Sequence, residues 1–201
     1  MDKKSQAKRN LILTNAKKVF IRKGFAAVTM KDIIEECEIS RGGIYLYFQS
    51  VDEIFMQVIE SHDQQKRKEA KQYISEDKSF EQVIDEYLDR QKKRLMNLDD
   101  SLLIAMYEYR FAKRDDYHKK EFFRTQFIYT KDIVLDILNY GFEKTGGTKR
   151  NTDALAASIV LLIEGISMLA VAAGISEGFI DNQIVSIKEM IFNENNEGSA
   201  K

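Results

Sequence analysis

Residues 29–55 read TMKDIIEECEISRGGIYLYFQSVDEIF, and this stretch predicts three helices, of which the first two are short and separated by a tight turn. Thr29 followed three residues later by Asp32 is typical of a capping box, which begins a helix by pairing its first free N–H groups. Ser40 can cap the second helix, predicted over residues 41–48. A helix, a tight turn and a short second helix make up a helix-turn-helix.

The second helix of this motif enters the major groove of DNA in proteins that use it for recognition. Arg41 carries a fork of donors that fits a guanine edge or a phosphate. Gly42 and Gly43 remove side-chain bulk, so that the backbone can approach DNA closely. Tyr45 and Tyr47 have hydroxyls that suit phosphate oxygens. The alternative reading of these residues is a helical hairpin with capped ends and no ligand.

The motif also resembles the signature of the TetR family of bacterial transcriptional regulators. The resemblance rests on Thr29, Ile33 and the run ISRGGIYLYF at residues 39–48, and it covers about the first sixty residues. Many positions agree at fixed spacing, which makes the match specific. The predicted DNA-binding residues are Thr29, Lys31, Ser40, Arg41, Gly42, Gly43, Tyr45 and Tyr47.

Three positions depart from the family pattern. Glu38 stands where the turn usually has glycine, which predicts a strained or reshaped turn. Gly43 stands where a larger residue often contacts DNA, and Val51 where a lysine often holds a phosphate. Lys31 could take over that phosphate contact.

The composition predicts an all-helical protein with a basic N-terminal part. The chain of 201 residues has no proline and only 10 glycines, and its apolar residues recur at helical spacing. Residues 1–50 hold ten basic and five acidic residues, net +5, and the remainder holds 21 basic and 27 acidic residues, net −6. A basic head on an acidic body is typical of a DNA-binding protein with a separate regulatory part.

The sequence predicts no enzyme, no cofactor and no metal site. No convergent set of acid, base and nucleophile is visible, and neither is a metal-ligand cluster or a phosphate-binding glycine loop. His62 and His118 stand in charged surroundings typical of surface residues. Cys37 is the only cysteine, which excludes an intrachain disulfide and suits a reducing cytoplasm. We expect a cytoplasmic protein because residues 1–10 do not resemble a secretion signal.

We expect a helix-turn-helix DNA-binding domain at residues 1–50, a helical regulatory and dimerisation domain at residues 51–193, and a disordered tail at residues 194–201. The helix that begins near Ser50 should run through the charged residues 62–71 and link the two domains.

The segment Ala154–Ala173 is long and apolar enough to span a membrane, but Glu164 lies at its centre. A helix that is apolar all round can equally be buried in protein, and we favour that reading, with no membrane partner. The resemblance implies a homodimer whose last two helices form a four-helix bundle. The predicted interface residues are Leu155, Ile159, Leu162, Glu164, Ile166, Ile184, Ile187 and Ile191.

The middle of the body is rich in aromatic residues, which suit a bulky and largely apolar ligand. Glu108 lies on an apolar helix face, so it should either receive a cationic or hydrogen-bonding ligand group or pair with a residue of another helix. The predicted pocket residues are Tyr87, Met106, Tyr107, Glu108, Phe111, Phe123 and Phe127.

The resemblance implies a repressor that a small-molecule effector releases from a pseudo-palindromic operator in duplex DNA. The alternative function is a DNA-bound factor whose body docks a protein partner instead of a small ligand.

Overall fold

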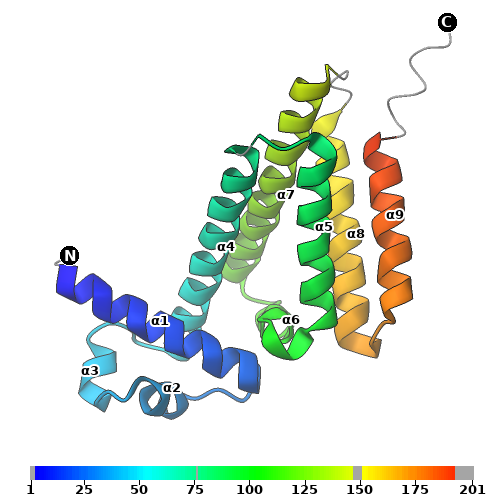
Figure 1. The fold of residues 1–201 in the computed structure, drawn as a ribbon. Coiled ribbons are helices and arrows are strands. Elements are labelled where there is room, and N and C mark those ends of the chain that lie inside the picture. The colour runs from blue at the N-terminus through cyan, green and yellow to red at the C-terminus, as the bar shows by residue number, and fades with distance from the viewer. Residues whose placement is uncertain (1–2, 76, 147–150, 193–201) are drawn as a thin grey trace, which may run out of the picture. The chain divides into compact units, whose positions relative to one another are not determined.

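A computed structural model describes residues 3–75, 77–146 and 151–192 of the chain. These ranges are largely helical and contain no strand, which confirms the all-helical class (Figure 1). The tail predicted over residues 194–201 lies outside the described residues. The elements are α1 (Lys3–Lys23), α2 (Met30–Cys37), α3 (Arg41–Tyr45), α4 (Val51–Ser75), α5 (Phe80–Met96), the 3-10 turn η1 (Leu98–Asp100), α6 (Leu103–Ala112), α7 (Tyr117–Thr145), α8 (Thr152–Ala173) and α9 (Glu177–Phe192).

The helices group into two compact units, and the division differs from the one predicted at residue 50. The first unit holds residues 1–65 and 98–120, and the second holds residues 66–97 and 121–201. Helices α4 and α7 therefore have residues in both units. The sequence assigned α6 to the body, but its side chains pack into the first unit through contacts that join distant parts of the chain.

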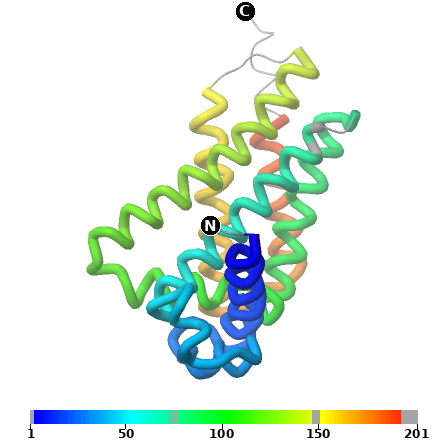
Figure 2. Tube along the Cα trace, turned by 90° about the vertical axis from the view of Figure 1, so that its left-hand side faces the viewer, coloured from blue at the N-terminus to red at the C-terminus, as the bar shows by residue number. Residues whose placement is uncertain are grey.

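Four aromatic rings form the centre of the first unit. Phe20 of α1 packs edge-on against Phe55 of α4, with ring centroids 4.6 Å apart. Tyr109 of α6 packs edge-on against Phe25, at 4.6 Å, and against Phe55, at 5.0 Å. Each such ring pair contributes about 0.5–1.5 kcal/mol beyond the burial of its surface. In Figure 2 the view runs nearly along α1, with α2 and α3 beside it.

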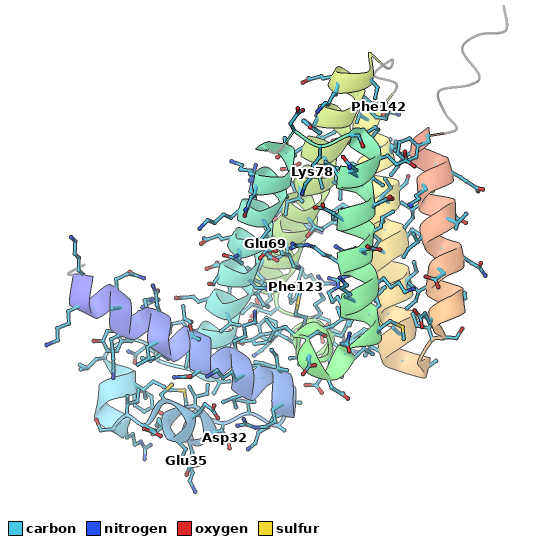
Figure 3. All side chains as sticks on the ribbon, viewed as in Figure 1. Asp32, Glu35, Glu69, Lys78, Phe123 and Phe142 are labelled. Atoms are coloured by element: carbon cyan, nitrogen blue, oxygen red, sulfur yellow. The ribbon has the colours of Figure 1, made fainter. Side chains whose placement is uncertain are left out.

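In the second unit α5, α7, α8 and α9 share one apolar core. Phe80 of α5 packs edge-on against Phe142 of α7, which is labelled in Figure 3, with ring centroids 5.4 Å apart. The residue before Phe142 is Gly141, and a Cβ atom there would lie 1.9 Å from the Phe80 ring. Glycine at this point in the last turns of α7 therefore allows the ring of Phe80 to lie against the helix backbone.

Helix α8 has the length and composition of a membrane-spanning helix, a test that the core helix of a soluble protein also passes. Leu155, Ile159 and Ile163 on this helix belong to the core of the second unit. Leu161 and Leu169, in contrast, are 61% and 43% exposed. Helix α8 is thus a core helix of the second unit with one apolar face left uncovered in the single chain.

Candidate nucleic-acid interface

Helix α2 begins at the capping box that the sequence predicted. The Thr29 hydroxyl accepts the N–H of Asp32 at 3.3 Å, and Asp32 Oδ2 accepts the N–H of Thr29 at 2.8 Å. The ammonium of Lys23, and after it the hydroxyl and N–H of Thr29, hold the pKa of the Asp32 carboxyl well below its usual range. Figure 3 labels Asp32 on this helix. The side chain of Thr29 is exposed but already engaged in the cap.

The turn between α2 and α3 has the geometry that glycine favours, although it carries a glutamate. Glu38 has φ 51° and ψ 43°, in the left-handed region, and its N–H donates to the carbonyl of Glu35 at 3.2 Å. The N–H of Ile39 donates to the carbonyl of Ile34 at 3.4 Å, which closes the helix end. A side chain in this conformation costs roughly 1–2 kcal/mol, so the predicted strain is present at Glu38.

Ser40 caps α3 as predicted, because its hydroxyl accepts the N–H of Gly43 at 3.1 Å. A Cβ atom on Gly43 would lie 3.1 Å from the same hydroxyl oxygen, so a side chain there would press on the cap. A Cβ atom on Gly42 would meet no atom within 4 Å, and Gly42 is exposed. The backbone of α3 is thus open at Gly42 and tightly fitted at Gly43.

Helix α3 ends at Tyr45, three residues before the predicted end at Phe48. Ile44 and Phe48 are both fully buried and hold this segment to the first unit, as the sequence spacing predicted. The chain leaves the helix at Leu46, which is 81% exposed. Sequence reasoning missed Leu46 as a surface residue of the motif, because an apolar side chain in a helical stripe is normally interpreted as core.

The predicted DNA-binding side chains lie on the surface of the motif. Arg41 is exposed and its guanidinium lies 5.9 Å from the ring of Tyr45. Tyr45 and Tyr47 are half-buried. Lys31 on α2 is 82% exposed, with Glu35 at 3.7 Å one turn away. The arrangement offers two cations and two phenol rings at the surface of the motif.

Arg9 has a structural position that the sequence did not reveal. Helix α1 already begins at Lys3, so Arg9 lies within a helix. The guanidinium of Arg9 lies 4.4 Å from the ring centroid of Phe48, and Nη1 donates to the carbonyl of Tyr47 at 3.0 Å. Arg9 therefore holds the end of the recognition segment against α1.

Helix α6 is attached to the first unit by polar groups as well as by Tyr109. The carboxylate of Glu108 accepts the N–H of Ala26 at 2.9 Å. A Cβ atom on Gly24, which has φ 71°, would lie 2.5 Å from the same carboxylate. Glu108, predicted to meet a ligand cation or a residue of another helix, accepts this N–H from the loop between α1 and α2.

A cluster around Asp52 joins the first turn of α4 to α6 and α7. Asp52 accepts from the hydroxyl of Tyr109 at 3.0 Å and from Lys119 Nζ at 2.6 Å, and Lys113 Nζ lies 2.8 Å from its other oxygen. Partial burial raises the pKa of the Asp52 carboxyl, but hydrogen bonds from Lys113, Lys119 and Tyr109 together lower it below its usual value. No sequence signal indicated this cluster, because its members are far apart in the chain.

The predicted pocket residues do not fall in one unit. Phe111 is 57% exposed and Tyr107 is only 6% exposed. The aromatic composition of this helix did not indicate which of the two side chains is buried. The first unit contains Met106, Tyr107, Glu108 and Phe111 on α6, and the second contains Tyr87 on α5 with Phe123 and Phe127 on α7.

Most of the predicted dimer residues are buried within the single chain. Because α8 is apolar on all sides, its sequence could not show which stripe packs internally. Leu162, Glu164 and Ile184 are half-buried. The residues that are at most 6% exposed are Leu155, Ile159, Ile166, Ile187 and Ile191.

Two family models match the chain. The one described as bacterial regulatory proteins of the tetR family matches residues 12–58, which include α2 and α3. The one described as the tetracyclin repressor-like C-terminal domain matches residues 83–181. The two matched spans therefore contain the helix-turn-helix and most of the remaining helices.

Curated proteins with similar sequences are named as regulators. The chain is 44% identical over 99 residues to the HTH-type transcriptional regulator YfiR of Bacillus subtilis, which is 49% of this chain and 47% of that protein. It is 38% identical over 53 residues to the regulator YerO of the same organism, covering 26% of this chain and 18% of that one. The chain spans less than half the length of these relatives.

Solved structures share the fold at low sequence identity. A TetR transcription regulator from Haloarcula marismortui has a TM-score of 0.76 at 17% identity, with 92% of this chain and 97% of that chain covered. A TetR-family regulator from Cytophaga hutchinsonii has a TM-score of 0.73 at 16% identity, with 96% and 97% covered. These proteins are named as regulators of transcription, not as enzymes. The motif, the fold and the two matched models together show that the chain belongs to the TetR family of bacterial regulatory proteins.

Proposed function

We propose that the protein is a transcriptional repressor that binds a pseudo-palindromic operator in duplex DNA and is released from it by a small, largely apolar molecule. The observation that carries the DNA-binding part is the exposed face of α3 and the turn after it. Arg41 is exposed there with its guanidinium 5.9 Å from the ring of Tyr45, and Tyr45 and Tyr47 are half-buried. These side chains suit one base edge and two phosphates.

The charge distribution supports the same partner. The N-terminal fifty residues carry net +5 and the rest of the chain carries net −6. A basic surface draws DNA by releasing the counterions condensed on its phosphates. An acidic body is repelled by DNA, which favours contact through the motif. A DNA-binding role also implies a cytoplasmic protein.

Binding to a labelled operator, found by selection from random duplex DNA, tests the proposal. Affinity should fall by roughly three orders of magnitude between about 50 and 200 mM salt if some six phosphates are contacted. Arg41→Ala should weaken binding and relax base preference by about 1–3 kcal/mol at one position. Tyr45→Phe should weaken binding to all sequences equally. An affinity that does not respond to salt would contradict the proposal.

The matched control for these variants is Arg124→Ala. Arg124 is an exposed arginine of the second unit, paired with Glu121 on the same helix. Its loss should leave both affinity and base preference unchanged. If Arg124→Ala weakens binding as much as Arg41→Ala does, the loss follows net charge and not a contact made by α3.

We infer that the homodimer forms through the exposed apolar faces of α8 and α9. Leu161 and Leu169 are separated by two turns of α8, and Gly165 lies between them with no atom within 4 Å of a Cβ placed on it. On α9, Phe179 and Val185 are 39% and 53% exposed. An apolar stripe of this length on two adjacent helices suits a four-helix bundle with a second copy.

Sedimentation of Leu161→Glu tests the dimer. This variant should shift the protein towards monomer. Operator affinity should then fall, because a monomer has a single reading helix and can bind only one of the two half-sites. The control is Ile128→Glu on α7, where another apolar side chain is 53% exposed. A Leu161→Glu protein that remains as dimeric as the Ile128→Glu protein would contradict this interface.

Release by an effector would require two states of the dimer with different separations of the reading helices. Helix α4 supports such a coupling because its first residues belong to the first unit and its last residues to the second. A ligand that favours the state with the wrong separation would lower operator affinity. We infer that this ligand binds the second unit, since its half-buried residues Tyr87 and Phe127 are partly accessible aromatic groups packed on the core.

A further inference from the structure

Arg94 of α5 is a half-buried cation in the second unit with a single hydrogen bond. Its Nη2 donates to the hydroxyl oxygen of Ser167 on α8 at 3.3 Å. Its Nε is buried and has no hydrogen-bond partner. Among the residues that the structure describes, no carboxylate lies within ion-pair distance of Arg94. The buried Nε–H of Arg94 therefore lacks a hydrogen-bond acceptor.

Ser167 cannot supply the missing negative charge. It is fully buried, and its hydroxyl donates to the carbonyl of Ile163 at 2.7 Å, so the oxygen offers Arg94 only a neutral lone pair. Taking a cation out of water without a counter-charge costs free energy, which proteins usually offset by an ion pair. The position of Arg94 is thus unfavourable unless another group completes it.

Two other half-buried or partly exposed arginines of the second unit, Arg90 and Arg67, have acidic partners. Arg90, one turn earlier on α5, donates to Glu69 at 2.6 Å, and Figure 3 labels Glu69 on α4. Arg67 also has a buried Nε without a partner, but Asp136 lies 3.9 Å from its Nη2 and the guanidinium lies over the ring of Tyr129. The absence of an acid beside Arg94 is therefore a property of its site.

Tyr87 lies on the same face of α5, two turns before Arg94. Burial raises the pKa of Tyr87 to about 12, while the positive charge of Arg94 acts in the opposite direction and Glu164 acts with burial. These influences place Tyr87 within electrostatic range of both charges. The Tyr87 hydroxyl therefore stays protonated at neutral pH and can act as a hydrogen-bond donor on the face of α5 that also carries Arg94.

We propose that Arg94 binds the carboxylate of an amphipathic effector, with Tyr87 as a second donor. The planar edge of Nε and Nη2 fits the two oxygens of a carboxylate, which gives a bidentate and charge-assisted contact. The apolar part of the effector packs against partly buried aromatic side chains of the second unit, Tyr87 and Phe127. This inference rests on the proposed ligand response. It assigns the effector a negative charge, whereas Glu108 alone suggested a cationic effector. The carboxylate of Glu108 already accepts the N–H of Ala26.

Calorimetric titration with matched probes tests the proposal on the full chain. The acids are decanoate and 2-naphthoate, which distinguish an aliphatic from an aromatic effector. The neutral matches are decanamide and 2-naphthamide, and decylamine is the cationic probe. At least one acid should bind at least tenfold more tightly than its amide and than decylamine. Equal binding of acids and amides, or no binding of either acid, overturns the proposal.

Three variants assign the contact. Arg94→Gln should weaken the acid by at least tenfold and leave the amide unchanged. Arg94→Lys keeps the charge but loses the fork, so it should weaken the acid by a smaller factor, and it serves if Arg94→Gln does not fold. Arg90→Gln is the matched control on the same helix and should bind the acid as the wild type does. An Arg94→Lys protein that binds both acids as tightly as the wild type overturns the bidentate contact.

Operator binding, measured in parallel, separates the two proposals. A protein that binds DNA but no carboxylate contradicts only the role of Arg94. A protein that binds a carboxylate through Arg94 but no operator contradicts the proposed function and leaves the site standing. When both bind, the acid should lower operator affinity in the wild type and not in Arg94→Gln.

Discussion

Two half-buried charges, one in each unit, differ in how they are partnered. In the first unit Asp52 has two ammonium groups and a phenol within 3.0 Å. In the second unit Arg94 has one serine oxygen at 3.3 Å. A charge whose partners are all supplied by the chain stabilises one arrangement of helices. A charge that lacks a partner leaves room for a ligand to stabilise it, and ligand sites are expected where such groups occur.

The apolar cores of the two units are also packed differently. The first unit gathers a few large rings from α1, α4 and α6 around Tyr109. The second unit relies on close approach between helices, as at Gly141 against Phe80. We therefore expect polar substitutions to be most harmful in the first unit and small changes of volume to be most harmful in the second.

The largest effect is expected from Gly141→Ala. The added Cβ atom would lie 1.9 Å from the Phe80 ring, so the ring or the helix must move. Overpacking of this kind costs typically about 1–3 kcal/mol, and we expect the upper end, measured as the free energy of unfolding in urea. Alanine normally stabilises a helix interior relative to glycine. The destabilisation predicted here is therefore opposite to the effect expected from helix propensity alone.

Gly178→Ala on α9 is the control for this prediction. A Cβ atom there would meet no atom within 4 Å. This variant should be neutral or stabilise the protein by up to about 1 kcal/mol. A Gly141→Ala protein as stable as the Gly178→Ala protein would show that the second unit does not depend on this close approach.

A medium effect is expected from Asp52→Asn in the first unit. Hydrogen bonds to a charged group contribute about 1.5–3 kcal/mol, and partial solvent exposure reduces this, so we expect a loss of about 1–2 kcal/mol at pH 7. The pKa of the Asp52 carboxyl is lowered in the folded protein. Its stabilisation is therefore present above the unfolded-state pKa and is lost as the pH falls through the folded-state pKa.

Denaturation series at neutral and acidic pH measure this difference. The gap in unfolding free energy between wild type and Asp52→Asn should shrink as the pH is lowered. Asp115→Asn is the control, because the Asp115 side chain is 91% exposed and should show little effect at any pH. A gap for Asp52→Asn that stays constant down to acidic pH would mean that its charge is not what holds the cluster together.

The smallest effect is expected at the turn of the motif. Glu38→Gly removes the steric penalty of a side chain at φ 51°, partly offset by the greater freedom of glycine in the unfolded chain. The protein should gain up to about 1 kcal/mol, seen as a higher melting temperature. Glu38→Gln removes the charge but keeps the strained backbone, so it should change little. If both variants raise the melting temperature equally, the effect comes from losing the charge of Glu38 and not from relieving backbone strain.

Interactions between near neighbours in the chain were readable from the sequence. Thr29 with Asp32 and Ser40 with Gly43 are each three residues apart, and the helical start itself brings these groups together. The helix-turn-helix and the positions of Arg41 and Tyr45 on its surface followed from this local geometry. The end of α3 was placed three residues too late, since Phe48 continues the apolar spacing after the helix has ended.

Contacts between distant residues depended on the tertiary structure alone. Glu108 meets Ala26 across 82 residues, and Arg9 meets Tyr47 across 38. Spacing in the sequence carries no information about such pairs, because helix packing decides which side chains meet. The same holds for α8, whose residues are apolar on every side. Only its packing decided that Leu155 is buried and Leu161 exposed, because burial of either stripe would remove similar apolar area from water.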